Sequence, residues 1–436
     1  MIDPTQQKAD EFLWRETTSL RALMRAWHDV KGRVIHSNDP RTRSDAEQFA
    51  ADPERNIRQL QKSLRSGKFQ FAAQRGILKI KRSAPGEARK PPRPIVASPL
   101  PNRVVQRAIL NTCQSDDPKI RRRLGKLPEV IATPTSVGGL PGRGVPEAMA
   151  MIRQTIASGT TWFVRSDLKA FFQHIPKPRV EEFLRANLAG PSFVDWFMKT
   201  LATELENEDE VRAWLDLFPL GEEGVPQGSA LSALCANIVL QTLDAELNCR
   251  GLTTLRYLDD FLILGRSRRA VELGFQRAQA ILAELGMECH DPGPGSKKAA
   301  KGHVTEGFEF LSFHIDQNDI YPSTAAQTAF LENFRVAVRH AKAELASVEN
   351  QPRRAEPRFI QCLAQLDRKV RGWGDAFAPT TKRIVFAQLD SEIGEILDDF
   401  QRWFRRRYSP ANTIRRRRLL GVALLGDTEH IRPPPA

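Results

Sequence analysis

The feature that most constrains this chain is a pair of adjacent acids inside an apolar run, RYLDDFLIL, at residues 256–264. The apolar residues on both sides predict a β-hairpin over residues 253–264 with Asp259 and Asp260 at its turn. Adjacent acids repel each other, and burial beside apolar neighbours is costly unless a cation lies nearby. The alternative is an exposed acidic turn, since Asp is common in turns. The apolar flanks count against it, because they predict a hairpin with buried faces.

A second acid, Asp167, closes another apolar run, and the aromatic residues Phe171 and Phe172 follow it. Residues 162–168 therefore predict a strand that ends on an acid. Phosphoryl transfer by two metal ions needs carboxylates from separate strands that converge on ions about 4 Å apart. Asp167 and the hairpin pair supply such a set. For Asp167 alone, a helix N-cap is the alternative.

A third motif is the loop GVPQG at residues 224–228, which precedes an apolar stretch. We expect a helix to begin at Ser229, and a loop containing Gln227 and Gly228 suits packing against a base pair. The alternative is an ordinary entry into a helix with a serine cap.

Charge and composition limit the partners of this chain of 436 residues, whose formal net charge is +13. An excess of Lys and Arg favours polyanionic partners, although a merely basic protein is the alternative. The five cysteines form no CxxC pair, which counts against a zinc ribbon or a disulfide framework. The N-terminus lacks the pattern of a signal peptide, and no run approaches the length of a membrane span. We therefore expect a cytoplasmic protein without membrane partners.

The element pattern predicts an α+β fold, with strands and helices alternating in the middle and helices at both ends. The expected strands include residues 76–80 and 162–168, with a strand pair or turn over 308–315. The expected helices cover residues 101–113, 177–205 and 270–285, and the chain after residue 323.

Taken in order, these motifs resemble those of reverse transcriptases. Asp167 with Phe171 and Phe172, then PQG at 226–228, then YLDD at 257–260, are similar to the family's motifs A, B and C. Further blocks agree with bacterial and group II intron enzymes: RPIV at 93–96, NRVVQ at 102–106, the Gly-rich segment 136–144, GFEFLSF at 307–313 and VRGW at 370–373. The resemblance departs from the family at Leu258, where many bacterial enzymes have Ala, and at Ala233, where Pro is frequent.

The resemblance implies a right-hand polymerase with fingers, an RRM-like palm and a helical thumb. Its implied boundaries are an N-terminal helical extension over residues 1–75, fingers over 76–160, a palm over 161–322 and a basic helical thumb and tail over 323–436. A fingers insertion would occupy about 175–225 of the palm.

It also implies roles for single residues. Asp167, Asp259 and Asp260 would hold two Mg²⁺ ions and act as the catalytic residues. Phe172, beside Phe171, would be a steric gate that selects dNTPs, with a core aromatic as the alternative. A lysine among 297, 298 and 301 would protonate the leaving group, and the sequence does not separate these three. The remaining dNTP contacts would come from Arg93, Gln227 and Gly228, and nucleic-acid contacts from Tyr257, Arg103, Arg143, Lys297 and Lys298.

The C-terminal region interleaves arginines with aromatic residues, a composition that grips phosphates and stacks on bases. A solvated basic helix face is the alternative. The residues that we expect to bind nucleic acid here are Arg405, Arg406, Arg407, Arg415 and Arg416, and Arg417 and Arg418 belong to the same run.

The reaction implied is RNA-directed DNA polymerisation, with dNTPs as substrates and DNA as the product. The template would be RNA, and a dedicated non-coding RNA is one candidate for it. We expect no mobility domain after the thumb. In this respect the chain resembles defence-associated reverse transcriptases, which act against phage. A retron- or CRISPR-associated reverse transcriptase and a maturase-like RNA-binding protein are the alternatives. A homo-oligomer or a partner protein is left open.

Overall fold

The computed structural model describes residues 12–37, 39–80, 91–249, 251–347 and 359–420. These residues form two compact units, one made of residues 1–144 and 162–302 and the other of 145–161 and 303–436. Helices and small sheets are mixed in the chain, as the α+β prediction requires. Within the described ranges, no helix is both long and apolar enough to cross a membrane.

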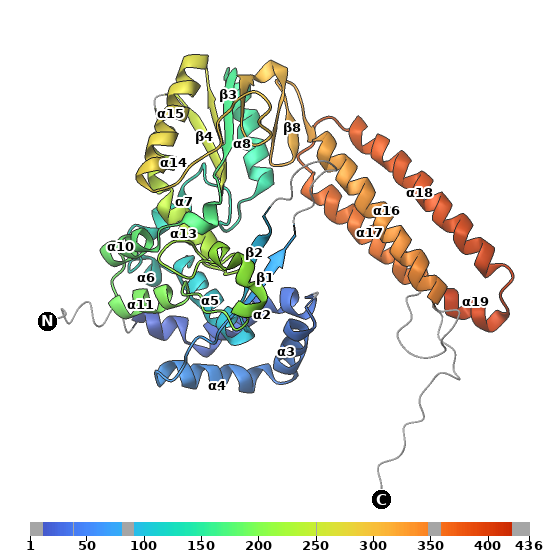
Figure 1. Ribbon diagram of the computed structural model, residues 1–436, viewed down its shortest axis with the longest axis horizontal. Helices are drawn as coiled ribbons and strands as arrows, with labels where there is room; N and C mark the ends of the chain where they lie inside the picture. Colours follow the sequence, from blue (N-terminus) through green and yellow to red (C-terminus); the bar gives the residue numbers. More distant parts are fainter. Residues whose placement is uncertain (1–11, 38, 81–90, 250, 348–358, 421–436) are drawn as a thin grey trace, which may run out of the picture. The chain divides into compact units, whose positions relative to one another are not determined.

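The first unit begins with amphipathic helices that pack on a helix from later in the chain. Residues 12–17 are helical, and three longer helices follow: α2 (Leu20–Ile35), α3 (Pro40–Ala51) and α4 (Pro53–Arg65). Side chains of Ser19, Asp39 and Asp52 cap the N-termini of these helices, which explains where they begin. Trp27 of α2 is buried, and α2 packs along α5 (Leu100–Cys113) (Figure 1).

Two strands follow these helices in the chain. β1 (Arg75–Lys79) and β2 (Arg93–Ala97) pair antiparallel, and the segment between them includes residues 81–90, outside the described ranges. The Pro-, Lys- and Arg-rich composition of residues 83–94 predicts a loop, and most of this stretch lies outside the described ranges. Short helices α6 (Pro118–Arg121) and α7 (Leu127–Ala132) follow α5.

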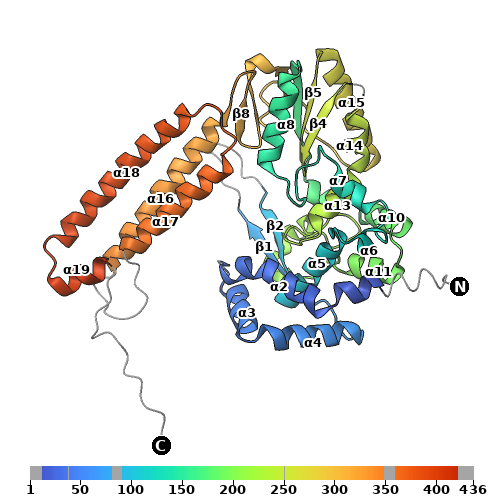
Figure 2. The same ribbon diagram turned by 180° about the vertical axis from the view of Figure 1, so that it is seen from behind.

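A four-stranded sheet with the order β4-β5-β3-β6 forms the centre of the first unit. Its strands are β3 (Trp162–Asp167), β4 (Thr253–Tyr257), β5 (Asp260–Gly265) and β6 (Ala300–His303). The β5 side chains from Phe261 to Leu264 are fully buried. Helix α15 (Arg268–Glu284) packs against β3 and β5, with Phe261 and Ile263 in one core with its Phe275, and α14 (Gln241–Leu247) packs against β4 (Figure 2). The predicted hairpin and the strand that ends on an acid are both present.

Two predicted helices differ from those observed. The expected helix over 177–205 is divided into α10 (Lys177–Asn187) and α11 (Pro191–Lys199), because Gly190 has a φ of 151° that helices do not use. The helix expected at Ser229 begins at Ser232 as α13 (Ser232–Val239). The remaining short elements of this region are α9 (Phe171–His174), α12 (Glu208–Val211) and the 3₁₀ helix η1 (Arg212–Leu217).

The second unit is mainly helical, as predicted for the chain after residue 323. Helices α16 (Thr324–Ser347), α17 (Phe359–Ala376) and α18 (Ile384–Tyr408) run side by side, and α19 (Thr413–Leu420) packs on α17 and α18 (Figures 1 and 2). Buried Phe334 and Phe400 belong to their common core. The unit also contains α8 (Val145–Ala157), η2 (Val304–Glu306) and a three-stranded sheet of β7 (Phe308–Phe310), β8 (Phe313–Ile315) and β9 (Ile320–Pro322).

The division into two compact units is coarser than the division that the resemblance implied. Residues 145–161 group with the C-terminal helices, whereas the resemblance assigned 145–160 to the fingers. Residues 303–322 also group with those helices, although the sequence placed them in the palm. The finer division into fingers, palm and thumb is taken up below as a proposal.

Candidate nucleotidyl-transfer site

The acidic pair lies on a tight hairpin, but only one of its two acids is in the turn. Tyr257 at the end of β4 pairs with Asp260 at the start of β5, so Leu258 and Asp259 form the connection. Leu258 has a φ of 57°, a left-handed conformation that side chains other than Gly rarely adopt. The prediction that both acids are at the turn therefore needs correction, because Asp260 already belongs to the strand.

Asp167 faces this hairpin from the neighbouring strand. In the antiparallel pairing of β3 with β5, Asp167 lies opposite Asp260. The backbone N–H of Leu168 donates to the carbonyl of Asp259 over 3.0 Å, which ties the end of β3 to the turn. Asp167 is 7% exposed. Asp167 and the adjacent pair Asp259 and Asp260, which are far apart in the sequence, therefore lie together at one end of the sheet.

The cluster is electrostatically costly. Burial, together with the charges of Asp167 and Asp259, raises the pKa of Asp260 to about 7. Burial and the charge of Asp167 also raise the pKa of Asp259. Such shifts at converging groups are typical of functional sites, where repulsion is retained for chemistry.

Cations offset part of this cost. The ammonium of Lys298 forms an ion pair with the carboxylate of Asp167. Lys298 and the exposed Arg93 of β2 both lower the pKa of Asp259, and Lys298 and Arg165 lower that of Asp260. The acids thus lie near cations from three segments of the unit: Arg93 on β2, Arg165 on β3 and Lys298.

The carboxylates fit a hard divalent cation by their chemistry, because Mg²⁺ prefers oxygen ligands. Among the residues that the structure describes, no group of three or more His, Cys, Asp and Glu side chains is arranged to hold a metal ion. Asp167 is held by Lys298 in this arrangement. The raised pKa values show that the acids repel one another, a repulsion that a bound cation would relieve.

The two aromatic residues after β3 have different environments. Ala170, with a φ of 44°, turns the chain into α9. Phe171 is buried, while Phe172 is only partly buried, and their ring centroids are 5.3 Å apart. The carbonyl of Phe172 accepts a hydrogen bond of 2.8 Å from the N–H of Val225. Phe171 is therefore a core residue, and Phe172 is the one of the pair that keeps an accessible face.

The loop with Gln227 and Gly228 is joined directly to β2. The N–H of Val96 donates to the carbonyl of Gln227 over 2.9 Å. A Cβ on Gly228 would lie 2.7 Å from the carbonyl oxygen of Val96, so this close approach requires glycine. The hydroxyl of Ser232, the first residue of α13, donates to the carbonyl of Pro226 over 2.7 Å and ties the start of the helix to this loop.

The structure separates the three candidate lysines. Lys298 contacts Asp167, whereas Lys301 pairs with Glu272 on α15 over 2.8 Å. Lys297 is exposed, and its carbonyl accepts a hydrogen bond from Arg165. Lys298 is therefore a lysine of this segment whose ammonium contacts the acidic cluster, and Lys301 pairs with α15 instead.

Two arginines expected to bind nucleic acid make contacts within the unit. The guanidinium of Arg103 donates to the carbonyl of Ser98 over 2.5 Å, and burial lowers the pKa of Arg103. Arg143 donates to the carbonyls of Ala132, Thr133 and Ser136, at and just beyond the C-terminal end of α7. A cation is favourable at that end of a helix. These side chains already serve the fold.

The C-terminal arginines fall into two groups. Arg405 and Arg406 are exposed on α18. Arg407 lies 4.5 Å from the ring centroid of Trp403, and Arg416 lies over Tyr408 and donates to the carbonyl at the end of α18. Arg415 is exposed on α19, as is Arg417, and the side chain of Arg418 lies outside the described part of the structure.

The sequence reasoning missed a buried pair next to the acidic hairpin, Arg256 with Asp244. Their side chains are 0% and 2% exposed. The available signal was an arginine within an otherwise apolar strand, because a charge there must have a partner.

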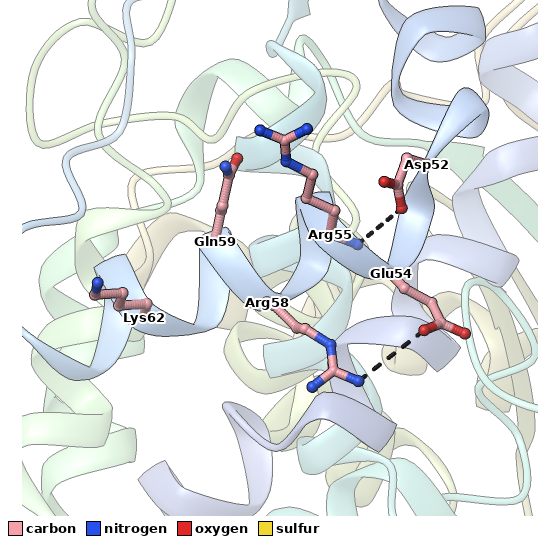
Figure 3. Close-up of a pocket in the computed structure, with 6 residues that line it drawn as sticks. All are labelled: Asp52, Glu54, Arg55, Arg58, Gln59 and Lys62. Atoms are coloured by element: carbon pink, nitrogen blue, oxygen red, sulfur yellow. Dashed lines mark hydrogen bonds and ion pairs between the residues drawn. The ribbon is translucent and has the colours of Figure 1, made fainter.

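A shallow hollow lies elsewhere, along the exposed side of α4 (Figure 3). Arg55, Gln59 and Lys62 line it together with Asp52, which caps the helix by accepting from the N–H of Arg55, and the ion pair between Glu54 and Arg58. These contacts are ordinary for an exposed helix surface, where ion pairs contribute little. None of the acids of the hairpin lines this hollow.

A strand-end acid that faces an acidic hairpin, with Lys298, Arg93 and Arg165 nearby, is an arrangement suited to nucleotidyl transfer. The family model described as "Reverse transcriptase (RNA-dependent DNA polymerase)" matches residues 87–315, just over half of the chain. The chain therefore belongs to the reverse transcriptase family. The matched range contains β2, the whole central sheet and the three acids.

Two curated proteins are similar to parts of the chain. An "Uncharacterized 91 kDa protein in cob intron" of Schizosaccharomyces pombe (strain 972) is 29% identical over 182 residues, which are 42% of this chain and 20% of that protein. "Protein YkfC" of Escherichia coli (strain K12) is 27% identical over 268 residues, 51% of this chain and 63% of that protein. The matches thus span less than two thirds of either relative.

Proposed function

We propose that this chain is an RNA-directed DNA polymerase that adds dNTPs to a 3′ end and releases pyrophosphate. The observation that carries the proposal is the placement of Asp167 opposite Asp260, with Asp259 in the adjoining turn. Burial and mutual repulsion raise the pKa values of Asp259 and Asp260, a cost that a merely structural hairpin does not need. Membership of the reverse transcriptase family supports the same reaction.

In this proposal Asp167, Asp259 and Asp260 hold two Mg²⁺ ions. Ions bound there would activate the primer hydroxyl and stabilise the charge of the leaving pyrophosphate. The role of Lys298 is to donate a proton to the leaving group, since its ammonium contacts Asp167. The same ammonium offsets the charge of Asp167 before substrate arrives.

The incoming nucleotide is positioned by residues from three segments. Arg93 is exposed on β2 and within electrostatic reach of Asp259, so its guanidinium suits the triphosphate. Gln227 and Gly228 are joined to the same strand through Val96 and would contact the nascent base pair. Phe172 would act as the steric gate, because its ring is partly exposed while that of Phe171 is buried.

We further propose the right-hand description, with fingers over 76–160, a palm over 161–322 including an insertion at about 175–225, and a thumb from 323. The central sheet with its acids supports the palm, and the three long helices α16 to α18 support the thumb. The template would be RNA and the product DNA, and Tyr257 would contact them beside the acids. On the second unit, the exposed Arg405, Arg406 and Arg415 would bind phosphates.

The cellular role proposed is cytoplasmic defence against phage, with a dedicated RNA as template, and the resemblance of the motifs supports it. A second candidate is an RNA-binding protein linked to an intron. One observation favours it, because a relative is described as a protein in the cob intron.

Primer extension on an RNA template tests the proposed reaction. Wild-type protein is expected to incorporate dNTPs with Mg²⁺, and Asp259→Ala with Asp260→Ala should reduce the rate by about 1,000-fold or more, since metal ions contribute several kcal/mol at the transition state. The matched control is Asp398→Ala with Asp399→Ala, an exposed adjacent pair on α18. Full incorporation by the hairpin variant would contradict the site. Absence of incorporation by the wild type, with tight RNA binding, would favour the RNA-binding protein.

A further inference from the structure

Arg256 lies in β4, the first strand of the acidic hairpin, and is fully buried. Its Nε donates to Oδ1 of Asp244 over 2.8 Å, and its Nη2 donates to Oδ2 of the same carboxylate over 2.5 Å. This is a two-point contact between a planar guanidinium and a carboxylate, which fixes the orientation of both. Asp244 is on α14, so the pair joins the strand β4 to the helix that covers it.

The remaining donors of Arg256 reach other segments of the site. The two N–H groups of Nη2 are shared between Asp244, the hydroxyl of Ser136 at 2.9 Å and the side-chain oxygen of Asn237 at 2.8 Å. Ser136 lies in the Gly-rich segment and Asn237 in α13, the helix that follows Gln227 and Gly228. Nη1 donates to the carbonyl of Leu258 in the hairpin turn over 3.2 Å. One side chain thus forms hydrogen bonds to the turn, to the Gly-rich segment and to the two helices α13 and α14.

Backbone contacts strengthen the connection with the Gly-rich segment. The N–H of Val137 donates to the carbonyl of Arg256, and the N–H of Arg256 donates to the carbonyl of Thr135, each over 2.9 Å. Gly138 approaches the turn so closely that a Cβ there would lie 2.6 Å from the backbone nitrogen of Leu258. The Gly-rich segment therefore runs along the edge strand β4 and against the turn.

The turn needs such support. Leu258 has a φ of 57°, which is unfavourable for a residue with a Cβ, and strained residues persist where surrounding contacts determine them. Its carbonyl is bonded to Arg256, and the next carbonyl, that of Asp259, accepts from Leu168 on the other side. The position of the Asp259 carboxylate follows from the conformation of this turn.

A buried ion pair is a poor way to stabilise a fold, because apolar residues of similar volume often do as well. It is an effective way to fix geometry, since each donor has a preferred direction. All three nitrogens of Arg256 are engaged, and Lys has a single nitrogen that would not reach the same set of acceptors. Chemistry that depends on carboxylate placement loses rate on displacements of about 1 Å.

We propose that Arg256, held by Asp244, Ser136 and Asn237, is a positioning residue that sets the conformation of the Leu258-Asp259 turn and so places the acids for catalysis. The proposal rests on the proposed polymerase function. It adds a role for the Gly-rich segment as the outer support of the turn. The hydrogen bonds of the Arg256 side chain go to Asp244, Ser136, Asn237 and Leu258, and not to the carboxylates of Asp167, Asp259 or Asp260.

The test compares Arg256→Lys with a control that removes a buried hydrogen bond elsewhere in the same unit. The control is Thr112→Val, which loses the 2.9 Å contact between the hydroxyls of Thr17 and Thr112. Arg256→Lys should lower kcat for dNTP addition by about 10- to 100-fold, the usual cost of losing a group that orients metal ligands. The KM for dNTP and the affinity for primer–template should stay within about twofold, because no substrate contact is removed.

Two measurements on the protein without turnover complete the test. Mn²⁺ binding, followed by electron paramagnetic resonance, should weaken about tenfold in Arg256→Lys. Amide hydrogen exchange should become faster in residues 135–138 and 256–260, which flank the turn. Thr112→Val should change neither, although both variants lose some stability.

Equal kcat and equal Mn²⁺ affinity in Arg256→Lys and wild type would overturn the proposal, as would identical changes in the Thr112→Val control. Should Arg256→Lys fail to fold, Ser136→Ala removes one acceptor and is expected to show smaller changes in the same quantities, with unchanged values overturning the proposal. If the wild type incorporates no dNTP, the proposed function fails. Hydrogen exchange then decides the positioning role by itself, with unchanged exchange in 256–260 counting against it.

Discussion

The two units differ in the environments of several of their arginines. Three arginines of the first unit are bonded within the fold: Arg256 to Asp244, Arg143 to carbonyls of the α7 end and Arg103 to Ser98. In the second unit, Arg405 and Arg406 on α18 are exposed. Proximity of an arginine to a motif is therefore a poor guide to ligand contact. The contacts that the side chain already makes decide whether it is available to a phosphate.

Among variants of the cationic side chains, the largest fall in kcat is expected for Lys298, which contacts Asp167 in the first unit. Lys298→Met should lower kcat by about 100-fold, within the range for loss of a general acid. The matched control is Lys301→Met, whose lysine pairs with Glu272 on α15. Single-turnover dNTP incorporation measures both. A similar loss in the two variants would show that the contact with Asp167 does not single out Lys298.

The next effect concerns the second unit. Arg405→Gln with Arg406→Gln should weaken binding of an RNA–DNA duplex and reduce the slope of log K against log salt by about 1 for each lost phosphate contact. Fluorescence anisotropy of a labelled duplex at several salt concentrations measures this slope. A slope equal to that of the wild type would assign these arginines to a solvated helix face.

The smallest effect is expected for an arginine bonded within the fold. Arg143→Gln removes its contacts with the carbonyls of Ala132, Thr133 and Ser136, and should lower the free energy of unfolding by about 1–2 kcal/mol. Urea denaturation measures the loss. The salt slope of duplex binding should not change, and a reduced slope would mean that Arg143 binds phosphate as the sequence suggested.

Much of the central architecture was predictable because its signals are local. The apolar runs that end in Asp167 and that flank Asp259 have the length and composition of strands, and both strands are present as β3 and β5. The hairpin was also predicted, yet the position of Asp260 in the strand depends on the backbone conformation of Leu258. Residue type alone does not reveal a left-handed leucine.

Other features depend on contacts between distant segments, and pattern reasoning did not reach them. Arg256 and Ser136 are 120 positions apart, and their hydrogen bond requires the Gly-rich segment to lie along β4. The choice among the three lysines also required the fold, because Asp167 lies 131 positions from Lys298. The break between α10 and α11, by contrast, had a local signal in Gly190 followed by Pro191, which the prediction of one helix over 177–205 overlooked.

The central claim is that β3 and β5 bring their acids into one reaction site. Single-turnover addition of one dNTP to a primer on an RNA template, compared between wild type and Asp167→Asn, tests it most directly. Asp167→Asn keeps the shape of the side chain opposite Asp260 and removes its charge. We predict unchanged primer–template affinity with incorporation reduced by about 1,000-fold or more. Incorporation at the wild-type rate would show that the reaction does not use the strand-end acid, and would contradict the account.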